Sequence, residues 1–168
     1  HVFKDLDVVA SPTRTAAQLI QRYGLQKEVT PVSCGIDLTR FNTQNDATRL
    51  KKQYGVPMDR KVILSVGRLE KEKRVEVTLR ALPEIVAKTD AHFIIAGIGK
   101  LQSALQQLAK SLGVSDHVTF TGFVPDEDMP DLYKTADVFF FVCIAELQSI
   151  VTMEAMASGL PKTPAIFW

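Results

Sequence analysis

Short apolar runs alternate along this chain with segments in which apolar residues recur at helical spacing. The runs KVILSVG, HFIIAG, HVTFTG and DVFFFVC lack strict alternation, which is typical of strands buried on both faces. Helical patterns separate and follow them, at about residues 74–88, 101–112, 126–135 and 149–157. This βαβαβαβα series predicts an α/β protein with a doubly wound parallel sheet.

A separate pattern occupies the start of the chain. DVVASP predicts a short strand that leads to a helix, with Ser11 as candidate N-cap. EVTPVSCGI predicts an edge strand, because Pro31 cannot donate a backbone hydrogen bond. Residues 41–56 are mostly polar and indicate a linker. We therefore expect three parts, residues 1–40, 41–56 and 57–168.

Composition and charge narrow the class of protein. Hydrophobic residues make up 46% of the chain and charged residues 23%, as in ordinary globular proteins. A net charge of +1 does not favour binding to nucleic acid or to an anionic membrane. No apolar run approaches the roughly 20 residues that span a bilayer. Cys34 and Cys143 lie far apart, without the spacing of metal ligands. We expect both to be small buried side chains of a protein in the reducing cytoplasm.

The loop GRLEKEK follows the first of the four buried strands, at the edge where open parallel sheets bind ligands. Gly67 permits a sharp turn, and Arg68 carries a planar fork suited to phosphate oxygens. Lys73 adds a second positive charge for the same diphosphate. The alternative is a solvated charge run, because glutamates stand at positions 70, 72 and 76.

Gly97-Ile98-Gly99 follows the next strand and is similar to part of a dinucleotide-binding fingerprint. The third glycine of that fingerprint is replaced by Gln102, and no acidic residue ends the following strand. The NAD hypothesis is therefore weak. We expect a tight turn with exposed backbone N–H groups.

Glu146 and Glu154 stand eight residues apart, around the start of the last predicted helix. Eight helical residues rise roughly 12 Å, beyond the about 5–9.5 Å that separate the carboxylates of a glycosidase. The pair fits recognition of two different hydroxyl groups better. The alternative is that both are solvated acids near a helix start.

Five segments in this order resemble glycosyltransferase family 4, whose members are retaining enzymes of the GT-B fold. They are GIDLTRF, SVGRLEKEK, IIAGIGK, VTFTGFVP and ELQSIVTMEAMASGLP, and the resemblance covers about residues 1–161. It implies two Rossmann-like domains, the first for the acceptor and the second for a nucleotide sugar. The chain would then be a fragment, inactive alone, with the end of the first domain and most of the second.

The resemblance also implies residue roles. Arg68 and Lys73 would hold the donor diphosphate, Glu146 would face the transferred sugar, and Glu154 would meet the ribose. Phe123 and Val124 would seat the nucleobase, and the backbone N–H groups of Ser149 and Ile150 would meet phosphate. The implied donor-binding set is Gly67, Gly97, Gly99, Phe123, Val124, Gln148, Ser149, Ile150 and Glu154.

Three departures from the family pattern stand out. Gln148 and Ser149 occupy positions where Phe-Gly is common, and Arg74 stands where Gly often follows the motif lysine. The tail KTPAIFW is unlike the usual strand after GLP.

The implied reaction transfers a hexose from a UDP- or GDP-sugar to a hydroxyl group of a lipid or glycan, with retention and without metal or cofactor. Cysteine usage predicts a cytoplasmic enzyme, with peripheral membrane attachment of the full-length protein left open. A GT-B epimerase of sugar nucleotides and a non-catalytic nucleotide-sugar-binding module are the alternatives.

Overall fold

The computed structural model describes residues 6–42 and 46–161, which form two compact units. The first unit comprises the residues up to Ile36 together with Glu146–Ile150. The second comprises Asp37–Ala145 and the residues from Val151 onward. The unusual tail, residues 162–168, lies outside the described residues.

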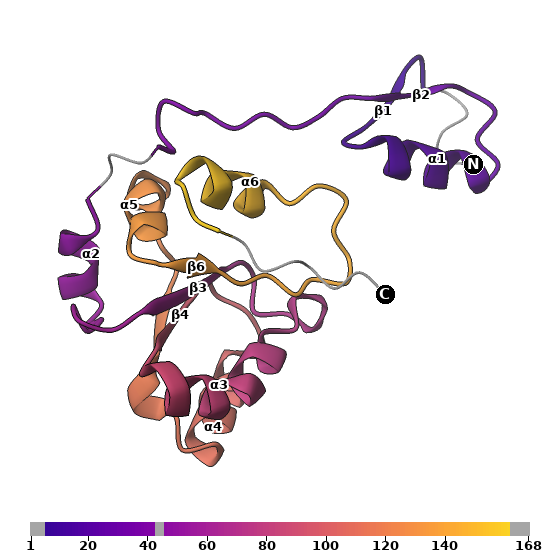
Figure 1. Ribbon diagram of the computed structural model, residues 1–168. Helices are drawn as coiled ribbons and strands as arrows, with labels where there is room; N and C mark the ends of the chain where they lie inside the picture. Colours follow the sequence, from indigo (N-terminus) through magenta and orange to yellow (C-terminus); the bar gives the residue numbers. More distant parts are fainter. Residues whose placement is uncertain (1–5, 43–45, 162–168) are drawn as a thin grey trace. The chain divides into compact units, whose positions relative to one another are not determined.

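The second unit is built on a four-stranded sheet (Figure 1). Its strand order is β5-β4-β3-β6, and every neighbouring pair is parallel. The strands are β3 (Val62–Val66), β4 (His92–Ala96), β5 (Val118–Gly122) and β6 (Val138–Phe139). The predicted α/β class with a parallel sheet is confirmed.

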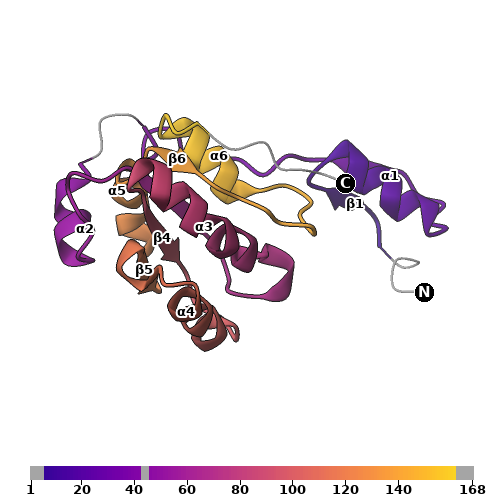
Figure 2. The ribbon, with the colours of Figure 1, turned by 60° about the horizontal axis from the view of Figure 1, so that its bottom comes forward.

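Helices cover both faces of this sheet (Figure 2). On one face, Ile63, Phe93 and Ile95 pack with α3 (Val75–Thr89) and α4 (Gln102–Ser111). The opposite face is covered by α2 (Thr48–Gln53), α5 (Met129–Lys134) and α6 (Ile150–Ala157). Short 3₁₀ turns complete the connections, at η1 (Lys71–Lys73), η2 (Ser115–His117) and η3 (Asp126–Asp128).

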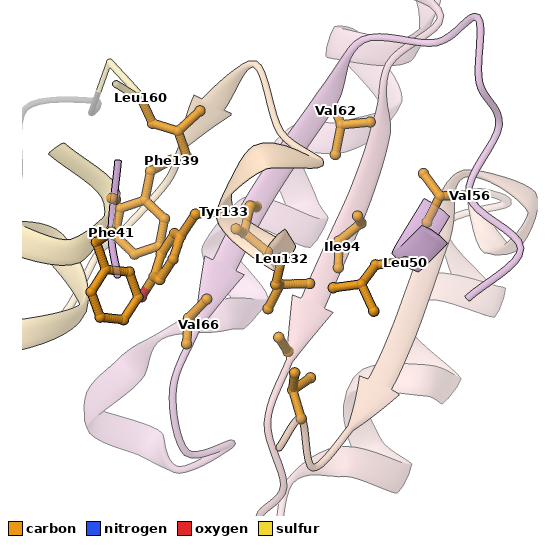
Figure 3. Packing of buried hydrophobic residues seen from close by; sticks show 14 residues of the cluster. Phe41, Leu50, Val56, Val62, Val66, Ile94, Leu132, Tyr133, Phe139 and Leu160 are labelled. Atoms are coloured by element: carbon orange, nitrogen blue, oxygen red, sulfur yellow. The ribbon is translucent and has the colours of Figure 1, made fainter. Parts of the chain in front are cut away.

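The segment predicted as a linker is part of the second unit. Phe41, Leu50 and Val56 are buried in the same hydrophobic cluster as Val62 and Ile94 (Figure 3). Three apolar residues of the predicted linker therefore lie in the core of the second unit. The apolar residues of this segment are sparse, and the polar composition alone does not reveal that these three are buried.

Strand β6 is shorter than the apolar run that predicts it. Only Val138 and Phe139 are in strand conformation, although Phe140 N–H still donates to Leu64 O at 2.8 Å. On the other edge, Phe139 N–H meets Pro161 O at 3.0 Å. Beyond these bonds, residues 141–149 are a loop. An apolar run alone therefore overstated the strand.

The first unit contains β1 (Val9–Ser11), α1 (Arg14–Arg22) and β2 (Val29–Pro31). The two strands are parallel, and Val9, Ala17 and Val29 form its small core. The N-cap of α1 is Thr13, whose Oγ1 accepts from Ala16 N–H at 3.1 Å, rather than the expected Ser11.

A buried histidine begins β4, at the amino edge of the sheet. His92 is 4% exposed, and its Nε2 lies 2.8 Å from Thr119 Oγ1. Its Nδ1 has no hydrogen-bond partner among the described residues. Burial, and next the charges of Arg60 and His117, lower the pKa of His92 to about 4. The side chain is therefore neutral near pH 7.

We expect His92 to make the stability of the chain depend on pH. Its pKa is about 6.5 when unfolded and about 4 when folded, so the unfolded chain binds more protons between these values. The contribution of His92 to the free energy of unfolding is fully present above about pH 6.5 and is lost as the pH falls towards 4. Between pH 7 and 5 the loss attributable to this group is about 2 kcal/mol.

Urea unfolding of the parent chain and of His92→Phe at both pH values measures this contribution. The variant should lose about 2 kcal/mol less than the parent between pH 7 and 5. The same loss in both proteins would contradict the assignment.

Candidate functional site

Three loops are joined by backbone hydrogen bonds at the carboxyl edge of the sheet. Gly67 N–H donates to Ala96 O at 3.0 Å, and Leu69 N–H donates to Ile98 O at 2.9 Å. Gly97 N–H donates to Gly122 O at 2.9 Å, which links the loops after β4 and β5. The loops that follow β3, β4 and β5 are therefore held together at one edge.

Glycine is required where the first two of these loops meet. A Cβ atom on Gly97 would lie 2.0 Å from Gly67 O, and one on Gly99 would lie 2.5 Å from Leu69 O. The expectation of exposed N–H groups is wrong for Gly97, since its N–H is bonded to Gly122 O. These glycines allow close contact between two backbones.

A hollow of about 360 Å³ lies over the joined loops. Each loop contributes residues to it: Gly67 and Arg68, Gly97 and Ile98, and Phe123 and Val124. The side chains of Phe123 and Ile98 are exposed, and Val124 is buried beneath them. Its volume is at the lower end of the range for ligand pockets, which suits part of a ligand such as one planar ring.

Arg68 and Lys73 lie with Gly67 and Phe141 around a narrow crevice that has no space for a water molecule. Arg68 is 73% exposed and pairs with Glu72 Oε1 at 3.2 Å. An exposed pair of this kind contributes at most about 1 kcal/mol, so an anionic ligand can replace the carboxylate. Lys73 Nζ lies 5.3 Å from the centre of the Phe141 ring, within cation–π range. The alternative interpretation, a solvated run of charges, therefore fits Arg68, which is exposed and paired with a glutamate. It fits Lys73 less well, because Lys73 packs over an aromatic ring.

Arg74 ends the η1 turn in the left-handed conformation, with φ 49° and ψ 37°. A side chain other than Gly is strained there by about 1–2 kcal/mol. This strain explains why glycine suits the position that follows Lys73.

Glu154 lies on α6, with its side chain half-buried. Its Oε2 accepts a hydrogen bond from the Tyr133 hydroxyl at 2.7 Å. Sequence reasoning missed Tyr133. A tyrosine on the buried face of a helix has a hydroxyl group that needs a partner, but only the fold shows that Tyr133 is buried and that its partner is Glu154.

The other predicted donor residues belong to the first unit. Glu146 is exposed in a loop. Within the same unit, Gln148 Oε1 accepts from Cys34 N–H at 2.8 Å, and its Nε2 donates to Ser33 Oγ at 2.6 Å. Ser149 precedes Ile150, the first residue of α6.

The described residues contain neither a candidate metal centre nor a candidate membrane-spanning helix. Over residues 6–42 and 46–161, no group of three or more His, Cys, Asp or Glu side chains is arranged to hold a metal ion. Within the same ranges, no helix is long and apolar enough to cross a bilayer.

We expect Gly97→Ala to destabilise the chain severely. The new methyl group would meet a backbone oxygen that cannot move without breaking the loop contacts. The free energy of unfolding should fall by more than about 3 kcal/mol, measured by urea denaturation. Gly113→Ala is the matched control, since Gly113 also has positive φ but has open space around it. It should cost about 1 kcal/mol, and equal costs would contradict the close contact.

Arg74→Gly should stabilise the chain. Glycine removes the left-handed strain at a smaller entropic cost, for a net gain of about 0.5–1 kcal/mol in urea denaturation. Lys71→Gly, in the same turn without positive φ, should lose a similar amount. Destabilisation by Arg74→Gly would show that the arginine side chain has a compensating interaction.

Comparisons with known proteins identify the family of this chain. The family model "Glycosyl transferases group 1" matches residues 46–162. An uncharacterized glycosyltransferase of Methanocaldococcus jannaschii is 41% identical over 66% of this chain and 28% of its own length. A GDP-mannose-dependent alpha-(1-6)-phosphatidylinositol monomannoside mannosyltransferase of Mycolicibacterium smegmatis is 34% identical over 96% of this chain and 44% of its own.

Among solved structures, Anabaena Alr3699/HepE in complex with UDP and glucose shares the fold. Its TM-score is 0.79 at 24% identity, and the alignment covers 92% of this chain and 43% of the other. The chain spans less than half the length of each of these proteins. The family match covers most of the chain, including the sheet and the loops that form the site. The chain therefore belongs to the group 1 family of glycosyl transferases, and its fold is similar to that of GT-B enzymes.

Proposed function

We propose that the protein transfers a hexose from a nucleotide-diphosphate sugar, UDP- or GDP-activated, to a hydroxyl group, with retention of configuration. The observation that carries the proposal is the convergence of three loops at the sheet edge, with two cations beside an apolar hollow. A nucleotide-diphosphate sugar presents the matching features, an aromatic base and a diphosphate with two negative charges, joined through a ribose.

The apolar hollow is the proposed seat of the base. Exposed Phe123 and Ile98 provide apolar contact. The similar Anabaena structure holds UDP and glucose, and the similar mycobacterial enzyme is named as GDP-mannose-dependent. These relatives support a nucleotide donor with either base.

Arg68 and Lys73 are the proposed diphosphate ligands. Arg68 is exposed and forms only a weak ion pair with Glu72. The Phe141 ring limits the orientations of the Lys73 ammonium group. As the bond to the sugar breaks, negative charge grows on the departing diphosphate, and fixed positive charges stabilise it most at that moment. We propose that these two side chains perform this task without a metal ion.

Glu154 and Glu146 are the proposed hydroxyl ligands, on the ribose and on the transferred sugar respectively. The ribose role of Glu154 is supported by the hydrogen bond from the Tyr133 hydroxyl group, which holds one carboxylate oxygen in place. Gln148, Ser149 and Ile150 are proposed donor contacts, the last two through backbone N–H groups at the start of α6. The remaining proposed contacts are Gly67, Gly97 and Gly99, whose role is to shape the loops.

The proposed acceptor is a hydroxyl group of a lipid or glycan. The name of the mycobacterial relative, with its phosphatidylinositol-based substrate, supports the lipid class. Peripheral attachment of the whole protein to a membrane would follow from such an acceptor. A cytoplasmic location stays a prediction from the sequence.

Nucleotide binding tests the proposal directly. UDP or GDP at about 100 times its Kd should stabilise the chain by about 2.7 kcal/mol, seen as a rise in Tm. Arg68→Ala should weaken binding about 10- to 100-fold in calorimetric titration, since one charge-assisted contact is lost.

Arg80→Ala is the control, because Arg80 is an exposed arginine within helix α3. It should bind the nucleotide like the parent chain. No binding of UDP or GDP at millimolar concentration by the folded parent would refute the proposal.

A further inference from the structure

Tyr133 differs from the other tyrosines of the described chain in how it is buried and bonded. Its side chain is 0% exposed, whereas Tyr23 is 84% exposed and Tyr54 lies partly buried at the margin of the same cluster. The Tyr133 hydroxyl donates to Glu154 Oε2 at 2.7 Å. A buried hydroxyl group therefore binds the carboxylate of Glu154, which the proposed function places on the ribose of the nucleotide sugar.

The Tyr133 ring is fixed by aromatic neighbours (Figure 3). Phe41 packs edge-on at 5.8 Å between ring centres, and Phe139 at 5.9 Å. Phe139 in turn stacks on Phe141 at 6.0 Å, and Phe141 lies beneath Lys73. Such contacts restrict the ring, so the hydroxyl group has a defined position.

This anchoring restricts the carboxylate of Glu154. With Oε2 bound to Tyr133, the side chain loses much of the rotamer freedom that glutamate otherwise has. Among the described residues, no hydrogen bond engages Oε1. The carboxylate thus presents one oxygen in a defined direction without a further entropic cost on ligand binding.

The hydroxyl group stays a donor over the working pH range. Burial, and then the negative charge of Glu154, raise the pKa of Tyr133 well above its ordinary value. The phenol remains protonated, and the direction of the hydrogen bond does not reverse.

We propose that Tyr133 is a positioning residue, which orients Glu154 so that it selects a nucleotide with the vicinal ribose hydroxyl groups. This inference rests on the proposed function, in which Glu154 meets the ribose. The hydroxyl group of Tyr133 does not touch the ligand. It acts through the carboxylate that it holds.

The test is titration calorimetry with UDP and GDP and with their 2′,3′-dideoxy forms. The parent chain should bind the ribose form at least about tenfold more tightly than the dideoxy form, the value of one good hydrogen bond. Tyr133→Phe should weaken binding of the ribose form about tenfold. It should leave affinity for the dideoxy form within about twofold, so the selectivity disappears.

Tyr54→Phe is the matched control, because it removes a hydroxyl group from the same cluster without touching Glu154. Its selectivity should equal that of the parent. Glu154→Asp provides a second variant, whose shorter carboxylate keeps its charge but retreats from Tyr133. It should also lose the selectivity, and it tests the proposal even if Tyr133→Phe does not fold.

The outcomes separate the two proposals. Equal weakening of both ligand forms by Tyr133→Phe would indicate a purely structural role and overturn the inference. Retained selectivity in Tyr133→Phe or Glu154→Asp would overturn it as well. A parent chain that binds both forms equally would overturn the role of Glu154 while the diphosphate site stands. A parent chain that binds neither form would overturn the proposed function itself.

Discussion

The close backbone contact between Gly67 and Gly97 is the constraint on which the rest of the site depends. A side chain at Gly97 would overlap Gly67 O, so only a residue without Cβ lets the loops after β3 and β4 meet. The hydrogen bond from Gly97 to Gly122 then adds the loop after β5. Arg68, Ile98 and Phe123 line one hollow because these three loops are joined.

A row of aromatic rings in the second unit supports two charged side chains, Lys73 and Glu154. Phe141 lies under the Lys73 ammonium, Phe139 stacks on Phe141, and Tyr133 packs against Phe139 and bonds Glu154. The run of three phenylalanines in DVFFFVC reads as core strand in the sequence. In the structure only Phe139 is in the strand, and Phe141 has left it to pack beneath Lys73.

Local signals predicted some elements well and others poorly, for physical reasons. Helix α3 was expected over about residues 74–88 and spans Val75–Thr89, because its apolar spacing is long and regular. Phe41, Leu50 and Val56 lie in the segment predicted as a linker, and such sparse apolar residues are recognised as core only when the sheet is present. Arg74 stands where glycine is common in the family pattern. Its left-handed backbone conformation is the physical reason why glycine suits that position.

By itself the sequence determined the alternation of buried strands and helices, the loops proposed to bind a ligand, and the residue types that could meet a nucleotide sugar. Periodicity and glycine positions are local properties, so they can be read along the chain. The tertiary structure alone decided that Gly97 serves a backbone contact, that Lys73 lies over Phe141 and that Tyr133 holds Glu154. These pairs are separated by 21 to 68 residues, and only the packing of the sheet and its helices brings their members within contact distance.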